Sequence, residues 1–563
     1  MKNIEADVVI IGSGPVGMVL ALDLAARGVS VVMAESRAEG EPPSVKCNHV
    51  SARSMEILRR LGVAGDVRDA GLPPDYPHDV SYRTTTTGRE VTRIRIAARA
   101  ERGTERDDGP DSNWPTPEPP HRINQIYLEP VIARHVKAHP GIRTLYRHAV
   151  VEIGQDARGA TLRARDIDSG AEVRLSGNFL VGCDGGRSMT RRFIGATLQG
   201  DAVIQRVQST YIRAPGLIER MQAAPAWCMF SVNPRRSGNI YSIDGRELWL
   251  VHNYLRDDEP DFDSVDRDRS IRDILGVDDG FSYEVIRNED WYGRRLVTDK
   301  MREGRVFICG DAAHLWVPYA GYGMNAGIAD AANLAWILAA HLRGWAPEAI
   351  LDAHEAERLP ITEQVSHFAM NHCIAMASKR ASVPADIESD TPEGTASREA
   401  FGAALFDLNV QQYCCGGLNF GYYYDASPLI AYDGAAQPAY GMADFTSSIV
   451  PGCRAPHLWL RDGRSLYDVI GGDYALLCLD GGDGAEALAA AARAVDMPFG
   501  VVAVDSDDPL RAVYTSRFVI VRPDQHVAWR GDALPDDPAA LIDLLRGAAP
   551  GKAGRNGLET AAQ

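Results

Sequence analysis

Three glycines near the N-terminus have the spacing found in loops that bind a nucleotide pyrophosphate. The motif reads Gly12-Ser13-Gly14-Pro15-Val16-Gly17 and follows a β-branched run over residues 6–11. Because glycine lacks a Cβ, the backbone and the start of the next helix can approach a pyrophosphate closely. Glu35 ends the next apolar run, at the spacing expected for a carboxylate that accepts hydrogen bonds from ribose hydroxyls. The pattern predicts dinucleotide binding, with a plain tight turn as the alternative.

A second chemical pattern follows a buried apolar run near residue 305. It contains Gly310-Asp311 and then the small-residue stretch Pro318 to Gly327, which leads into a helix. A carboxylate at the carboxyl end of a strand lies where α/β sheets bind ligands. The small residues would let a flat ring lie on the backbone, with amides at the helix start facing negative charge on that ring. A third stretch, Asp184-Gly185-Gly186-Arg187, also ends a strand, and ordinary turns are the alternative for both.

The elements around these motifs alternate between strand and helix. A strand over 6–11, a helix over 15–27 and a strand over 29–34 form one βαβ unit. Further along, 201–290 reads mostly as strands and turns, and a long apolar helix is expected over 327–342. The stretch 97–120 is rich in proline and charge and predicts a surface excursion. The polar stretch 379–397 predicts a linker or an irregular crossing segment.

Beyond residue 450 a new series of expected strands and helices predicts a small, separate α/β domain. We expect strands over 474–479 and 499–505, a hairpin over 518–529 and a closing helix over 539–545. The predicted division of the chain is 1–200, 201–290, 291–449, 450–546 and a disordered tail over 547–563.

Composition limits the class of partner. The 563 residues carry 59 Lys and Arg against 76 Asp and Glu, a net charge of −17, which argues against nucleic acid or an anionic membrane as the main partner. The segment Val8 to Ala26 is broken by three glycines, Pro15 and Asp23, so no membrane span is expected. Nine scattered cysteines without a Cys-x-x-Cys motif fit a reducing compartment, and we expect a cytoplasmic protein. His367 and His372 are five residues apart and do not share a helix face, so no metal site is expected.

Taken in order, the three motifs resemble those of the single-component (class A) flavoprotein hydroxylases, whose prototype is p-hydroxybenzoate hydroxylase. Further matches are Arg53 in Ser51-Ala-Arg-Ser-Met-Glu-Ile-Leu and Gln125 before Leu128-Glu129-Pro130. The small C-terminal domain is similar to that of the phenol hydroxylase branch, which includes the 2,4-dichlorophenol and 3-(3-hydroxyphenyl)propionate hydroxylases. The resemblance implies an α/β fold: a Rossmann-like FAD-binding domain, an inserted β-sheet substrate domain at 201–290, and a thioredoxin-like C-terminal domain.

The resemblance also implies FAD as cofactor, with NADH or NADPH as a transient co-substrate. Asp311 would meet the ribityl chain, and the backbone of Gly323-Met324-Asn325 the flavin pyrimidine edge. The residues expected to bind the cofactor are Gly12, Gly14, Pro15, Gly17, Glu35, Arg37, Arg53, Gln125, Asp184, Asp311, Pro318, Gly321, Gly323, Met324 and Asn325. Where the family usually has a Gly-Gly pair before the flavin, this chain has Ala320-Gly321.

The implied reaction is hydroxylation of a phenolic or related ring with O2, through a flavin hydroperoxide. Water must be kept out of such a site, and a phenol near pKa 10 must be helped toward phenolate. Tyr241, His252 and Asn48 are the polar side chains expected to contact the substrate hydroxyl, although Asn48 cannot act as a base. Trp227, Trp291, Trp316 and Tyr319 are expected to line the pocket, with simple core packing as the alternative for each.

Two other functions remain open at this point. The same fold could perform Baeyer–Villiger oxidation or epoxidation, or it could serve as a non-catalytic flavin-fold interaction protein. The intact Gly310-Asp311 loop argues against the non-catalytic reading. The expected partners are a small aromatic substrate and O2, and the C-terminal domain is expected to serve packing or contact in a homodimer.

Overall fold

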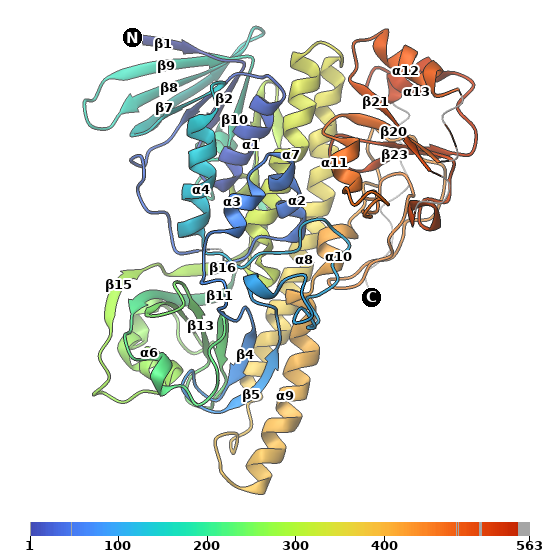
Figure 1. Cartoon of the computed structure of the whole chain (residues 1–563). Coiled ribbons are helices and arrows are strands. Elements are labelled where there is room, and N and C mark those ends of the chain that lie inside the picture. The colour runs from blue at the N-terminus through green and yellow to red at the C-terminus, as the bar shows by residue number, and fades with distance from the viewer. Residues whose placement is uncertain (1, 47, 480, 482–483, 506–508, 550–563) are drawn as a thin grey trace.

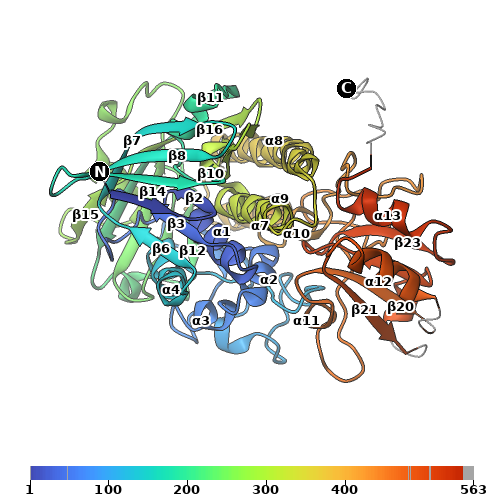
Figure 2. The same ribbon diagram turned by 90° about the horizontal axis from the view of Figure 1, so that it is seen from above.

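The computed structural model of the chain describes residues 2–46, 48–479, 481, 484–505 and 509–549. Figure 1 shows two sheet-containing regions stacked on one side of two long central helices and a C-terminal domain on the other. Figure 2, the view from above, shows the same order, with helices α7 and α8 between the N-terminal sheets and the C-terminal domain. The predicted disordered tail lies, from residue 550 onward, outside the described residues.

The first region is built on a six-stranded sheet whose four central strands, β2, β3, β10 and β18, are apolar and buried. Its order is β17-β18-β10-β2-β3-β6, and all neighbouring pairs except β17 with β18 are parallel. Parallel strands need covered faces and crossover helices, which explains the helix between β2 and β3. The strands are β2 (Val8–Ile11), β3 (Val31–Ala34), β6 (Ile142–Leu145), β10 (Phe179–Gly182), β17 (Arg302–Glu303) and β18 (Val306–Ile308).

Helices and a smaller sheet cover this sheet. The helices are α1 (Pro15–Ala26), α2 (Ala52–Arg60), α3 (Ala64–Arg68), α4 (Gln125–Ala138), α5 (Met189–Phe193) and α7 (Tyr322–Leu342). The smaller sheet has the order β1-β9-β8-β7, formed by β1 (Lys2–Glu5), β9 (Glu172–Gly177), β8 (Ala160–Asp166) and β7 (His148–Gln155). The predicted βαβ unit is therefore β2, α1 and β3.

The second region is a nine-stranded sheet with the order β19-β16-β11-β14-β13-β12-β4-β5, and β15 pairs with β11. Helix α6 (Arg267–Leu275) covers one face with Trp249 and Val251 in the core beneath it. The strands are β4 (Val80–Arg83), β5 (Glu90–Ile94), β11 (Leu198–Arg213), β12 (Cys228–Ser231), β13 (Gly238–Ser242), β14 (Leu248–Tyr254), β15 (Glu284–Asn288), β16 (Trp291–Thr298) and β19 (His314–Trp316).

This sheet is wider than the predicted 201–290 segment. β4 and β5 lie within the range predicted as the first part of the FAD-binding domain, yet β4 pairs in parallel with β12. At the other end β16 pairs with β11, and β19 adds the segment that follows Gly310-Asp311. Local patterning does not reveal such pairings, because each strand satisfies its backbone groups on a partner far away in the sequence.

Two long helices run downward beside the second region in Figure 1. They are α8 (Ala353–Ala381) and α9 (Pro392–Tyr413), followed by the short α10 (Gly416–Phe420). In the stretch 379–397, predicted as a linker or an irregular crossing segment, residues 382–391 form a connection, and the two ends belong to α8 and α9. Thr391 caps α9 by accepting a hydrogen bond from the Gly394 amide, and Pro392 takes the first helical position.

The C-terminal domain is a four-stranded sheet with the order β21-β20-β22-β23 and flanking helices. β20 is parallel to β21 and antiparallel to β22. Its elements are α11 (Leu466–Ile470), β20 (Tyr474–Leu479), α12 (Ala485–Arg493), β21 (Phe499–Val504), β22 (Phe518–Val521), β23 (Val527–Gly531) and α13 (Pro538–Leu545).

The C-terminal domain shares its core with the first region. Tyr474 of β20 packs edge-on against Trp336 of α7, with ring centroids 6.0 Å apart, and against Trp345 at 6.4 Å. Both tryptophans and Tyr474 are buried. Among the described residues, none of the helices combines the length and the apolar character needed to cross a bilayer.

Candidate active site

The glycine turn brings three backbone segments into close contact. Gly12 has φ +98°, and a Cβ there would lie 2.4 Å from the carbonyl oxygen of Cys183. A Cβ on Gly17 would lie 2.2 Å from the Gly12 oxygen, whereas Gly14 has open space around it. Pro15 takes the first position of α1, whose opening N–H groups lie at this point. The turn is therefore shaped for a pyrophosphate at the helix N-terminus.

A cavity of about 180 Å³ opens beside this turn, lined in part by Ser13, Glu35, Arg37 and Glu129. One carboxylate oxygen of Glu35 accepts from the Ser13 amide at 2.8 Å, and the other accepts from the Arg37 amide at 2.9 Å. Arg37 donates to Glu129 at 3.0 Å, and burial raises the pKa of the Glu129 carboxyl. Glu35 lines this cavity with its carboxylate held by two backbone amides, so it is positioned to accept from ribose hydroxyls.

Asp311 follows β18 after Cys309 and Gly310, and this residue is exposed to solvent although protein surrounds it on several sides. Partial desolvation raises the pKa of this carboxyl, against the opposing effects of His314 and Lys46. Within the described part of the chain, no hydrogen bond reaches the Asp311 carboxylate. It is therefore available as an acceptor for hydroxyl groups of a ligand, as predicted for the ribityl chain.

The segment from Pro318 to Asn325 forms a tight loop before α7. Ala320 has φ +60°, a left-handed conformation that the usual glycine adopts without strain, and Gly321 has φ +63°. The Asn325 side chain donates to the His49 and Gly321 carbonyl oxygens and accepts from the Ser51 amide at 2.9 Å. Asn325 thus fixes the loop to the chain before α2, leaving the backbone at the start of α7 for a ligand.

A buried ion-pair cluster holds the Gly310-Asp311 turn in place through the Gly310 amide. Asp330 of α7 accepts from the Gly310 amide at 3.2 Å, from His314 Nε2 at 2.8 Å and from Arg358 Nε at 2.8 Å. Although burial opposes ionisation, the pKa of Asp330 is lowered by Arg358 and His314. His314 therefore helps to hold the turn in place through Asp330. Arg358 was missed, because a single arginine on α8 carries no local signal.

Three predicted cofactor residues are engaged elsewhere by their side chains. Asp184 caps α5, accepting from Ser188 Oγ and from the amide and hydroxyl of Thr190. Gln125 donates to Glu129. The guanidinium of Arg53 binds Glu56, Gln525 and the carbonyl oxygen of Asp524, so it joins α2 to the C-terminal domain. Contact of these three residues with FAD stays a prediction, and the Asp184 backbone borders the glycine turn.

Four predicted aromatic side chains lie in a row on the face of the nine-stranded sheet opposite α6. Ring centroids are 5.4 Å apart for Trp227 and Tyr241, 5.6 Å for Tyr241 and His252, and 5.8 Å for His252 and Trp291. The strand order explains the row, because β12, β13, β14, β11 and β16 are neighbours. Trp316 joins the same face at β19, opposite Arg295. The predicted substrate residues therefore lie on one sheet face whose edge strand, β19, follows Asp311 in the chain.

Burial sets the charge of the two polar members of this row. It lowers the pKa of His252 to about 4, so the imidazole is neutral near pH 7. It raises the pKa of Tyr241 well above its ordinary value, with Cys228 adding to the effect, so that phenol stays protonated. Both side chains are nonetheless half-buried rather than fully enclosed. The face thus offers one neutral acceptor and one hydroxyl donor.

Tyr319, predicted as a pocket residue, is buried and bound to an arginine that the sequence reading missed. Arg380, near the end of α8, donates to Tyr319 Oη at 3.2 Å and lies 4.4 Å from the Tyr254 ring centroid. The side-chain oxygen of Asn48, predicted as a substrate contact, accepts a hydrogen bond from Asn124. Within the described ranges, no group of three or more His, Cys, Asp or Glu side chains could hold a metal ion.

Comparison with known families accounts for most of the chain. Residues 5–369 match the family described as FAD binding domain, and residues 448–549 match the aromatic-ring hydroxylase C-terminal family. The chain is 26% identical to phenol 2-monooxygenase of Pseudomonas sp. (strain EST1001), over 97% of this chain and 93% of that protein.

Solved structures give the same picture. The rebeccamycin biosynthetic enzyme RebC with reduced flavin superposes with a TM-score of 0.88 at 33% identity, covering 98% of this chain and all of that one. The ternary complex of aklavinone-11 hydroxylase with FAD and aklavinone gives a TM-score of 0.78 at 25% identity, over 97% and 99% of the two chains.

Fold and site together define a flavoprotein monooxygenase that uses FAD and takes electrons from NAD(P)H. Within that class, the chain belongs to the FAD-dependent aromatic-ring hydroxylases, and the predicted α/β fold with its thioredoxin-like C-terminal domain is confirmed. The comparisons support aromatic hydroxylation and give no support to the two alternative functions.

Proposed function

We propose that the chain hydroxylates a phenolic ring held against the sheet face that carries Trp227, Tyr241, His252 and Trp291. The row of rings supports this proposal best, because it presents flat apolar surface together with one hydroxyl donor and one neutral acceptor. Aromatic side chains favour stacked or edge-on contacts with a ring substrate. Trp316 and Tyr319 would close the pocket on the side of the cofactor loop.

The residues that fit FAD run along one path from the glycine turn to the start of α7. Gly12, Gly14 and the opening of α1 would hold the pyrophosphate, Glu35 the ribose and Asp311 the ribityl hydroxyls. The backbone of Gly323-Met324-Asn325 would meet the flavin ring. Bound FAD would supply the redox chemistry, passing electrons from NAD(P)H to O2 so that one oxygen atom reaches the substrate.

Tyr241 and His252 would hold the phenol hydroxyl by hydrogen bonds. His252, with a pKa of about 4, is too weak a base to take a proton fully from a phenol near pKa 10. Accepting a hydrogen bond from that hydroxyl still shifts electron density into the ring, while protonated Tyr241 donates to the same oxygen. The surrounding rings would exclude water from the reacting atoms.

Kinetics across a panel of phenols would test this assignment. Substrate-stimulated NAD(P)H oxidation and product masses would be measured for wild type, Tyr241→Phe and His252→Asn. We expect each variant to keep FAD and lose about tenfold to a hundredfold in kcat/KM for hydroxylation. Tyr283→Phe is the control, because Tyr283 hydrogen-bonds to Asp268 near α6, away from the row.

Two results would contradict the proposal. If no phenol stimulates NAD(P)H oxidation, the substrate class is wrong. If both variants hydroxylate a phenol as fast as wild type does, the substrate does not contact this face.

A further inference from the structure

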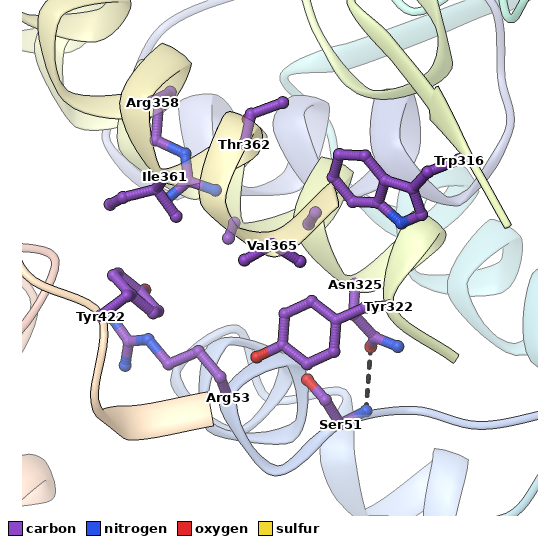
Figure 3. Close-up of a pocket in the computed structure, with 12 residues that line it drawn as sticks. Ser51, Arg53, Trp316, Tyr322, Asn325, Arg358, Ile361, Thr362, Val365 and Tyr422 are labelled. Atoms are coloured by element: carbon purple, nitrogen blue, oxygen red, sulfur yellow. Dashed lines mark hydrogen bonds between the residues drawn. The ribbon is translucent and has the colours of Figure 1, made fainter. Parts of the chain in front are cut away.

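Two smaller cavities accompany the one beside Glu35. The first, of about 10 Å³, lies behind the start of α7, and Figure 3 shows Arg53 and Trp316 on opposite sides of it. It has room for one water molecule at most. The second, of about 70 Å³, lies where the end of α3, the chain before β4 and the proline-rich stretch 97–120 meet. That volume is several times the minimum for one water, so a small polyatomic ligand fits there.

The wall of the 70 Å³ cavity is basic. It is formed by three arginines, two histidines and two prolines, and none of these described residues is acidic: Arg68, His78, Arg99, Arg102, Pro119, Pro120 and His121. Arg68 ends α3, His78 precedes β4, and the others belong to the stretch 97–120 or follow it directly. The fold therefore gathers basic side chains from separate stretches of chain around one small space.

Contacts along the wall hold these residues close to one another. Arg99 donates to the Arg68 carbonyl oxygen at 2.8 Å, and Arg68 donates to the Pro120 carbonyl oxygen at 3.3 Å. The rings of His78 and His121 meet edge to face, with centroids 6.1 Å apart. Burial lowers the pKa of His121 to about 3, and the charges of Arg68 and Arg99 act in the same direction. The positive groups are therefore near enough to act on a single site.

Two of the basic side chains at this cavity have nitrogens without a protein partner. His78 is only 2% exposed, yet within the described part of the chain nothing hydrogen-bonds to its ring. Arg99 Nε is likewise buried without a partner. A buried polar group without a partner costs about 1–3 kcal/mol, and more when it is charged. A ligand in the cavity that accepts a hydrogen bond from His78 would remove part of this cost.

Charge decides which kind of ligand fits. Arg68 and Arg102 each have a carboxylate partner outside the lining. The carboxylate that approaches Arg99 is Asp69, at 3.8 Å, and its side chain is 90% exposed, so water screens this pair. The charge of Arg99 is thus only weakly neutralised on the protein side. An anion in the cavity would be attracted by all three guanidinium groups, whereas a cation would be repelled.

We propose that this cavity binds a tetrahedral oxyanion, a phosphate or sulfate group, held by Arg99, Arg102 and His78. Guanidinium groups bind such oxyanions through charge-assisted hydrogen bonds, and a neutral imidazole adds one N–H donor. The volume takes the oxyanion alone, which is either a free ion or the phosphate group of a larger ligand. The bound group would tie the stretch 97–120 to α3. This proposal does not depend on which ring the enzyme hydroxylates.

Selenate provides the direct test, because selenium gives an anomalous signal. Crystals of the FAD-loaded protein, grown without phosphate or sulfate, would be soaked in sodium selenate and measured at the selenium absorption edge. We expect a peak in the cavity within hydrogen-bonding distance of Arg99 and His78. A cavity that holds only water in these crystals would overturn the proposal.

A matched pair of variants tests the contact in solution. Arg99→Met removes the weakly neutralised charge and leaves no buried carboxylate unpaired, because Asp69 is exposed. Arg95→Met is the control, since Arg95 pairs with Asp108 at 3.1 Å and does not line the cavity. Phosphate affinity would be obtained from the rise in melting temperature of the FAD-loaded protein, with sodium chloride holding ionic strength constant. We expect Arg99→Met to weaken phosphate binding about tenfold and Arg95→Met to bind like wild type.

Equal phosphate affinities in wild type and Arg99→Met would overturn the proposal. So would a selenate peak without any effect of phosphate on melting, which would mark an adventitious ion only. Glycerol 3-phosphate distinguishes the two sources: binding tighter than that of phosphate, and weakened in Arg99→Met, assigns the site to a phosphorylated ligand, and weaker binding assigns it to the free ion. If Arg99→Met fails to fold, the selenate measurement on wild type decides.

Discussion

At the scale of single residues, Asp311 is the side chain most clearly left for the cofactor. It is a solvent-open carboxylate at the end of a buried strand, and no described residue donates to it. Nearby Asp330 is also a carboxylate, yet three protein donors already occupy it. Asp311 is therefore free to bind a ligand, whereas Asp330 holds the loop in place.

Replacing Asp311 by Asn should weaken FAD binding. The change keeps the shape but removes the charge from hydrogen bonds to ribityl hydroxyls, so the Kd for FAD should rise about tenfold to a hundredfold. Quenching of flavin fluorescence on titrating the apoprotein measures this. Asp156→Asn, in the turn after β7, is the control and should bind FAD like wild type. An unchanged Kd in Asp311→Asn would mean that the ribityl chain lies elsewhere.

At the scale of elements, the buried pair of Glu357 in α8 with Arg522, directly after β22, joins the C-terminal domain to the rest. Arg522 donates to both carboxylate oxygens of Glu357, at 2.6 and 2.8 Å, and to Asp524 at 2.7 Å, and all three side chains are buried. Removing one partner of such a pair leaves an uncompensated charge.

Arg522→Gln should therefore lower the free energy of unfolding by about 3–5 kcal/mol. Arg530→Gln is the matched comparison: Arg530 of β23 forms a more exposed pair with Asp433, which precedes the C-terminal domain, and losing it should cost less than about 1 kcal/mol. Urea unfolding of both variants would measure the difference. Equal losses would show that the buried pair does not hold the domains together.

The sequence predicted the local parts of this arrangement and missed the distant ones. The βαβ unit, the Gly310-Asp311 turn and the C-terminal hairpin follow from patterns within about ten to thirty residues. The contacts of Arg53 with the C-terminal domain were missed, because its partners at 524 and 525 lie far away in the chain. α8 was not predicted, since it contacts both α7 and the sheet and so lacks a single apolar stripe.

At the scale of the whole molecule, histidine burial should make the fold sensitive to acid. Burial lowers the pKa of eight histidines, to about 3 for His121 and about 4 for four others. The group comprises His49, His78, His121, His252, His354, His372, His457 and His526. In the unfolded chain these side chains bind protons near pH 6.5, whereas in the folded chain they do not.

Stability should accordingly fall as the pH drops from about 6.5 toward 4, because the unfolded state takes up more protons in that range. Melting temperatures of the FAD-loaded protein at pH 7.5, 6.5, 5.5 and 4.5 would show this trend. A melting temperature that stays constant or rises toward pH 4.5 would contradict the neutral state assigned to the buried histidines. The expected homodimer stays a prediction, which light scattering would test in the same samples.

The central claim is that the chain inserts one oxygen atom from O2 into an aromatic ring, and oxygen-18 labelling tests it most directly. The enzyme would turn over its best phenol with NAD(P)H under labelled O2, and mass spectrometry would follow the label. We predict one atom of oxygen-18 in the hydroxylated ring. NAD(P)H consumption with the label only in water and hydrogen peroxide would contradict the claim.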